Sequence, residues 1–141
     1  MKNNNKIQLF LVDDDALFLK LLEIDFLTHT NFTIKTFATG ELCMANLTHN
    51  PDVIILDYYL DSIDKNAMNG LKTLDKINSF NPDISVVMLS SQNKIDVAIN
   101  CIHHRAFDYL VKSQTDFLNL KKIITTIFHY KKMGKELSWS I

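Results

Sequence analysis

The chain has 141 residues, a formal net charge of −1 and 47% hydrophobic residues, a composition typical of one globular domain with a sizeable core. The near-neutral charge argues against direct binding of nucleic acid or of an anionic membrane surface. No apolar run approaches the roughly 20 residues that span a bilayer and no signal peptide opens the chain, so we expect a cytoplasmic protein.

Apolar runs alternate with amphipathic segments five times, after a loose polar lead at residues 1–6. Runs rich in Val, Ile and Leu predict buried strands at Ile7–Val12, Thr33–Phe37, Val53–Leu56, Ser85–Leu89 and Phe107–Val111. Helical spacing predicts helices from about Leu17 to Thr28, Gly40 to Pro51, Gly70 to before Pro82, Lys94 to about His104 and Asp116 to Phe128. Residues 131–141 are expected to form a tail or an extension of the last helix.

Each predicted helix carries an apolar stripe. The residues on these stripes are Leu17, Leu21, Ile24 and Leu27 in the first helix, Leu42, Ala45 and Leu47 in the second, Leu71, Leu74 and Ile77 in the third, Ile95, Ala98, Ile99 and Ile102 in the fourth, and Phe117, Leu120, Ile124, Ile127 and Phe128 in the fifth. The regular alternation predicts an α/β fold with helices on both faces of a parallel sheet. We expect a flavodoxin-like (βα)5 three-layer sandwich with strand order 2-1-3-4-5.

Polar residues with complementary chemistry stand where the predicted strands end. Asp13 and Asp14 follow the first strand, Asp57 the third, Ser90 the fourth and Lys112 the fifth. Because the carboxyl ends of parallel strands share one edge of the sheet, these side chains should meet in one crevice. Three carboxylates there repel one another unless a hard cation such as Mg²⁺ or Mn²⁺ lies between them. A carboxylate held beside such a cation can attack phosphorus and form an aspartyl phosphate.

Four stretches carry a resemblance to a known family: Leu11–Asp15, Pro51–Asp57, Val87–Ser91 and Asp108–Lys112. They resemble the CheY-like receiver domain of response regulators in two-component signalling, with 7–130 as the expected domain. The resemblance implies phosphorylation by a histidine kinase or phosphotransfer protein and signalling to a downstream protein or output domain. It implies a signalling domain that assists its own phosphorylation and dephosphorylation, and no conventional enzyme.

The resemblance also implies a role for each residue of the crevice. Asp57 corresponds to the phosphoacceptor, and Lys112 to the lysine that pairs with the phosphoryl group. Asp14, Asp57 and the backbone carbonyl of Tyr59 correspond to the direct ligands of Mg²⁺, and Asp13 to the acid that reaches the ion through water.

Further residues correspond to those that transmit and terminate the signal. Ser90 matches the switch hydroxyl, and Tyr109 the aromatic side chain that swings inward when the hydroxyl moves. Tyr59 and Gln92 flank the approach of the water that hydrolyses the aspartyl phosphate; Tyr59 should obstruct it, and neutral Gln92 offers no general base. The face made by the fourth helix, the fifth strand and the fifth helix is expected to carry the signal and to support a homodimer.

The chain departs from the family pattern at three places. Ser113 replaces the usual proline after the lysine, so we expect a trans peptide between Lys112 and Ser113. Arg105 replaces a glycine, which should alter how the fourth helix ends. Residues 58–69 form a longer loop than usual, without the alternating acids of a calcium loop.

Three alternatives remain open. The chain could be the receiver half of a DNA-binding transcription regulator, or a pseudo-receiver that binds partners without phosphorylation. It could also be a phosphatase of the haloacid-dehalogenase kind, with Asp13 as nucleophile and Asp15 as acid. That scheme leaves Asp57 unexplained and lacks a Thr or Val where Leu17 stands, and Asp15 is the natural cap of the first helix.

Overall fold

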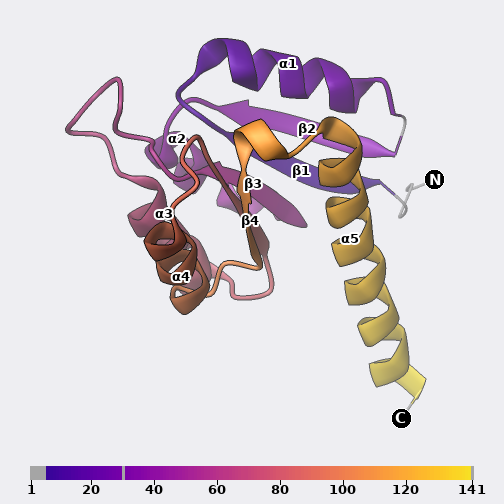
Figure 1. The fold of residues 1–141 in the computed structure, drawn as a ribbon. Helices are drawn as coiled ribbons and strands as arrows, with labels where there is room; N and C mark the ends of the chain where they lie inside the picture. Colours follow the sequence, from indigo (N-terminus) through magenta and orange to yellow (C-terminus); the bar gives the residue numbers. More distant parts are fainter. Residues whose placement is uncertain (1–5, 30, 141) are drawn as a thin grey trace.

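A five-stranded parallel sheet lies between two layers of helices in the computed structural model, which describes residues 6–29 and 31–140 (Figure 1). The elements in chain order are β1 (Ile7–Val12), α1 (Ala16–Leu27), β2 (Phe32–Phe37), α2 (Gly40–Ala45), η1 (Leu47–His49), β3 (Val53–Asp57), α3 (Gly70–Phe80), β4 (Ser85–Ser90), α4 (Ile95–His103), β5 (Asp108–Val111), η2 (Lys112–Gln114) and α5 (Phe117–Ser140). Most of the polar lead expected at residues 1–6 lies outside this description.

The strands are ordered β2-β1-β3-β4-β5 and all pair in parallel, which confirms the predicted flavodoxin-like topology. Helices α1 and α5 cover one face of the sheet, and α2, α3 and α4 cover the other. Alternate residues of β1 serve the two layers: Leu9 and Leu11 pack toward α1 and α5, whereas Phe10 and Val12 pack toward α2 and α3. Burial on both faces explains the unbroken apolar runs of the sequence.

The apolar stripes expected to cover the core are wrong for α1 and α4, and in α2 the expected core residues Leu42 and Ala45 are exposed while Cys43 is buried. The outward residues are Leu17, Leu21, Ile24 and Leu27 in α1, and Ile95, Ile99 and Ile102 in α4. In α1 the buried residues are Leu22 and Phe26. The ring of Phe26 packs edge-to-face against that of Phe32, with 5.0 Å between the ring centroids. Because α1 is apolar nearly all round, spacing alone could not decide which face is buried. The stripes of α3 and α5 do face the core.

Two helix boundaries differ from the predicted ones. Helix α2 ends at Ala45, where the amide of Asn46 donates to the carbonyl of Leu42 and a short 3-10 turn follows. Helix α5 continues to Ser140, well past Phe128, so the expected tail or extension is an extension of this helix; the side chains of 135–141 lie outside the description. Within the described ranges, no helix combines the length and the apolar character needed to cross a bilayer.

The expected cap of α1 and the expected trans peptide are both found, whereas the left-handed backbone is retained at Arg105, where we expected the end of α4 to change. The Asp15 carboxylate caps α1 by accepting from the backbone N–H of Phe18 at 3.1 Å. No peptide bond among the described residues is cis, so the Lys112–Ser113 bond is trans. Arg105, after the end of α4, has a positive φ of 68°. The backbone therefore keeps the left-handed conformation that favours glycine, but a residue with a Cβ adopts it.

Replacing Arg105 with glycine should raise the free energy of unfolding by about 1 kcal/mol, because the left-handed conformation is strained for a residue with a Cβ. Urea denaturation followed by circular dichroism measures the change. Arg105→Ala is the matched control, since it removes the same side chain and keeps the strained backbone. An equal gain in both variants would show that the guanidinium, and not the backbone, is responsible.

Candidate functional site

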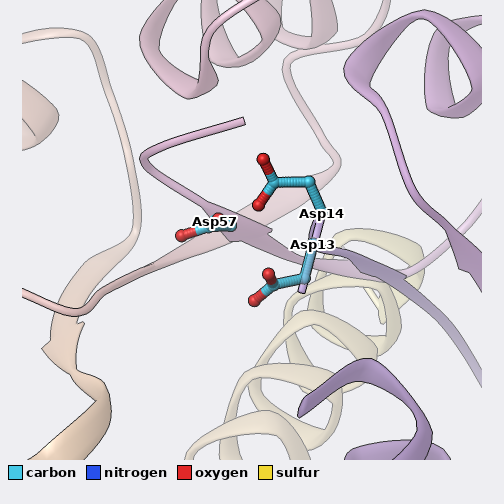
Figure 2. Close-up of side chains that lie close together, drawn as sticks. All are labelled: Asp13, Asp14 and Asp57. Carbon is cyan, nitrogen blue, oxygen red and sulfur yellow. The ribbon is translucent and has the colours of Figure 1, made fainter. Parts of the chain in front are cut away.

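Three carboxylates meet at the carboxyl ends of β1 and β3, as the sequence predicted. Asp13, Asp14 and Asp57 each offer an oxygen, and these oxygens all lie within 4.8 Å of one another. Figure 2 shows the three side chains gathered around the end of β3. Asp13 and Asp57 are buried and Asp14 is half-buried. Adjacent parallel strands thus bring residues 44 positions apart in sequence into one charged cluster.

Lys112 is the cation that pairs with this cluster among the described residues. Its Nζ lies 2.7 Å from Asp13 Oδ2 and 3.6 Å from Asp57 Oδ1. The ammonium also sits over the ring of Phe18, 4.3 Å from the centroid. This role of Phe18 could not be predicted from the sequence, because an aromatic residue in the first turn of a helix is more often an ordinary core residue. One lysine leaves the three carboxylates with an excess of negative charge.

The burial of these acids shifts their protonation. The pKa of Asp57 is raised to about 7, chiefly by burial and then by the charge of Asp13, while Lys112 opposes the rise. The pKa of Asp13 is also raised by burial, against the hydrogen bond from Lys112. Burial alone would lower the pKa of Lys112, but its hydrogen bond to Asp13 and the charge of Asp57 leave it raised. The cluster therefore resists full ionisation near neutral pH unless more positive charge arrives.

The loop after β3 supplies hydrogen-bond donors to the same site. The hydroxyl of Ser62 lies 2.7 Å from Asp14 Oδ2 and 3.0 Å from the carbonyl oxygen of Tyr59, and the N–H of Ile63 donates to Asp14 Oδ2 at 3.3 Å. Neither contact was expected from the sequence, which placed residues 58–69 in a surface loop. Only the unusual length of this loop pointed to a local role.

Gly70 lets the start of α3 approach the site closely. A Cβ built on Gly70 would lie 2.3 Å from the carbonyl oxygen of Asp57 and 2.7 Å from Cα of Tyr58. The N–H of Gly70 donates to the carbonyl of Tyr58 at 3.1 Å, which fixes the backbone that follows Asp57. The absence of a side chain at Gly70 is therefore a steric requirement for the position of Asp57.

The two predicted switch residues, Ser90 and Tyr109, are linked through the backbone of Gln92. Ser90 is fully buried at the end of β4, and its Oγ accepts from the N–H of Gln92 at 3.1 Å. The hydroxyl of Tyr109 donates to the carbonyl of Gln92 at 2.6 Å. Both polar groups of the Gln92 backbone are thus engaged, one by each predicted switch residue. The sequence did not indicate this link, because backbone groups carry no side-chain signature.

The donor set fits a hard divalent cation. All the groups that could bind a metal ion here offer oxygen atoms. They are the three carboxylates and the carbonyl of Tyr59, which contacts the same Ser62 hydroxyl as Asp14. Mg²⁺ prefers oxygen ligands and commonly uses one or two carboxylates together with water. A divalent cation would also neutralise the negative charge that Lys112 leaves uncompensated.

Asp57→Asn should stabilise the protein in EDTA by a few kcal/mol at pH 8, since each pKa unit corresponds to about 1.4 kcal/mol. The carboxyl group has an ordinary pKa of 3.8 and about 7 in the folded state, so the folded state binds the proton more tightly. The free energy of unfolding of the parent should therefore fall as pH rises from about 4 to 7. The variant should lack the part of this fall that comes from ionisation of Asp57. Urea denaturation at several pH values measures it. Equal pH profiles for parent and variant would contradict the assignment of the raised pKa to Asp57.

Comparison with known proteins places this geometry in a family. Residues 9–125 match the family described as the response regulator receiver domain. The luminescence regulatory protein LuxO of Vibrio campbellii is 28% identical over 72% of this chain and 21% of its own length. The protein-glutamate methylesterase/protein-glutamine glutaminase of Bacillus subtilis is 36% identical over 80% of this chain and 32% of its own length. The chain thus spans about a fifth to a third of these curated relatives.

Solved structures agree in fold. The signal receiver domain of a Luxo repressor protein from Vibrio parahaemolyticus superimposes with a TM-score of 0.81 at 24% identity, covering 94% of this chain and 97% of that one. A chain of the CheX–CheY–BeF3–Mg²⁺ complex from Borrelia burgdorferi gives a TM-score of 0.73 at 25% identity, covering 86% of this chain and 89% of that one. With the family match spanning most of the chain and the acidic cluster at the predicted strand ends, the protein belongs to the response regulator receiver domains.

Proposed function

We propose that this receiver accepts a phosphoryl group on Asp57 in a Mg²⁺-dependent reaction, from a histidine kinase or a phosphotransfer protein. The observation that carries the proposal is the convergence of Asp57 with two further carboxylates and with Lys112, 3.6 Å away, at one edge of the sheet. A similar fold occurs in the CheX–CheY–BeF3–Mg²⁺ complex of Borrelia burgdorferi, which contains such a cation and a fluoride.

The ion would be held by Asp14, Asp57 and the Tyr59 carbonyl, with Asp13 reaching it through water. Bound Mg²⁺ supplies positive charge that offsets the carboxylates and favours the approach of an anionic phosphodonor. Mn²⁺ suits the same oxygen ligands. The ionisation of Asp57, which burial opposes near neutral pH, becomes favourable when that charge is present.

Asp57 is the nucleophile of the proposed transfer, and Lys112 stabilises the transferred group. A carboxylate oxygen of Asp57 forms a bond to phosphorus while the bond between phosphorus and the nitrogen of the donor phosphohistidine breaks, and the donor nitrogen retains the electron pair. Lys112 Nζ, now shared between Asp13 and Asp57, is close enough to donate to an oxygen of the transferred group. Phe18 holds one face of this ammonium away from water.

The signal then passes through Ser90 and Tyr109. When the Ser90 hydroxyl turns toward a phosphoryl oxygen, it releases the N–H of Gln92 that it now accepts from. The carbonyl of the same residue holds the Tyr109 hydroxyl, so movement of Gln92 frees the ring to move inward. This couples phosphorylation to the surface of α4, β5 and α5.

Exposed apolar residues support this surface as the place where partners bind. On and beside α4 these are Ile95, Ile99, Ile102 and Phe107. A downstream protein, an output domain or a second copy of the chain is the proposed partner.

We propose no direct contact between this domain and nucleic acid. The second candidate function is that of the receiver part of a longer transcriptional regulator. Relatives named as transcriptional regulators, such as ZraR of Salmonella typhimurium, are far longer than the matched region. A haloacid-dehalogenase mechanism is disfavoured because Asp15 caps α1.

Phosphorylation should be tested by intact-mass spectrometry after incubation with acetyl phosphate and Mg²⁺. The parent should gain one phosphoryl group and Asp57→Asn should gain none, because the nucleophilic oxygen is gone. Asp83→Asn, the same change at the opposite end of the sheet, is the matched control and should label like the parent. Labelling of Asp57→Asn at the parent level would reject Asp57 as the acceptor.

The lifetime of the aspartyl phosphate should depend on Tyr59. Its half-buried ring packs edge-to-face on Tyr58 at 4.8 Å, beside the expected path of the hydrolytic water, and neutral Gln92 supplies no general base. Tyr59→Asn should therefore accelerate phosphate release severalfold in Mg²⁺, whereas Tyr59→Phe, which keeps the ring, should behave like the parent. Release rates from the purified phosphoprotein measure this. Unchanged release in Tyr59→Asn would reject steric shielding.

A further inference from the structure

The loop between β3 and α3, residues 58–69, projects from the body of the domain (Figure 1), and hydrogen bonds fix it at several points. Asp64 forms a tight turn by accepting from the N–H of Asn66 at 3.0 Å. Glu41 of α2 accepts from the N–H of Met68 at 2.9 Å. Asn69 caps α3 by accepting from the N–H of Lys72 at 2.8 Å. The loop is therefore held at its turn, near Asp64, and at its end, near Asn69. The residues before the turn lie against the acidic cluster.

In that first half, a Ser62–Ile63 clamp contacts two of the proposed metal ligands. The single proton of the Ser62 hydroxyl is shared between Asp14 Oδ2, at 2.7 Å, and the Tyr59 carbonyl oxygen, at 3.0 Å, and the Ile63 N–H is a second donor to Asp14 Oδ2. Both donors approach the same oxygen of Asp14. Asp14 thus keeps its other oxygen, Oδ1, for a further partner, and the carbonyl of Tyr59 keeps its second lone pair.

Hydrogen bonds to the distal oxygen of a carboxylate orient it toward a metal ion and reduce the rotamer freedom that binding must remove. Asp14 needs such support more than Asp13 or Asp57, because it is half-buried while they are enclosed by the sheet. Ser62 itself is exposed, so the hydroxyl contributes little to the core. The contacts of Ser62 therefore serve to orient the proposed metal ligands and add little to the stability of the fold.

We propose that Ser62 is a positioning residue for the divalent cation: it orients Asp14 and the Tyr59 carbonyl together, so that the loop of residues 58–69 raises the affinity of the site for Mg²⁺. The inference deepens the proposed function and rests on it. Ser62 acts through these two ligands and does not touch the ion or the phosphoryl group.

Three variants and two binding measurements test the proposal. Isothermal titration calorimetry gives the dissociation constant for Mg²⁺, and Mn²⁺ broadening of amide NMR signals reports the same site without phosphorylation. Ser62→Ala should weaken binding by about tenfold, the lower end of the 10–100-fold range seen when such outer partners are removed. Ser62→Thr keeps the hydroxyl and should restore binding. Ile63→Ala keeps the backbone N–H, removes an exposed side chain and should bind like the parent.

The other outcomes overturn the proposal in distinguishable ways. Parent-like affinity in Ser62→Ala would show that the hydroxyl does not position the ligands. Tighter binding in Ser62→Ala would show that the hydroxyl competes with the cation for Asp14. Loss of affinity that Ser62→Thr fails to restore would assign the effect to loop packing instead. Absence of Mg²⁺ binding in the parent would overturn the proposed function as well, whereas binding in the parent with unchanged affinity in Ser62→Ala would overturn this inference alone.

Discussion

Burial of acidic groups beside a single lysine is the constraint on which the site depends. Asp13 and Asp57 are buried at the edge of the sheet. The ammonium of Lys112 forms a close ion pair with Asp13 and a longer one with Asp57. Because this arrangement opposes full ionisation, the pKa of Asp57 rises to about 7 and the cluster is poised to gain positive charge. The same imbalance of charge supports the proposed binding of a divalent cation and the proposed transfer of a phosphoryl group to Asp57.

The fold creates this imbalance through the geometry of parallel strands. Their carboxyl ends share one edge, so residues that directly follow separate apolar runs become neighbours there. Gly70 then allows the first turn of α3 to lie against the backbone of Asp57, which a side chain would prevent. The backbone of Gln92 connects both predicted switch residues, so a change at the acidic edge has a short path to the surface of α4 and β5.

The strand ends could be predicted from the sequence, because buried parallel strands leave unbroken apolar runs and the first polar residue marks the end. The buried faces of α1 and α4 could not, since both helices carry apolar residues on two faces and spacing favoured the exposed set, such as Leu21 and Ile99. The role of Ser62 was equally hidden: a lone serine in a polar loop has no distinctive pattern, and only the fold brings it to Asp14.

The most direct test of the central claim is the unfolding free energy of the parent protein as a function of Mg²⁺ concentration, measured at pH 5 and at pH 8. An ion that binds only the folded state stabilises it progressively as its concentration exceeds the dissociation constant. If excess buried negative charge drives the site, Mg²⁺ should stabilise the protein at both pH values and more strongly at pH 8, where Asp57 is mostly ionised. Equal stability with and without Mg²⁺ at pH 8 would contradict the account.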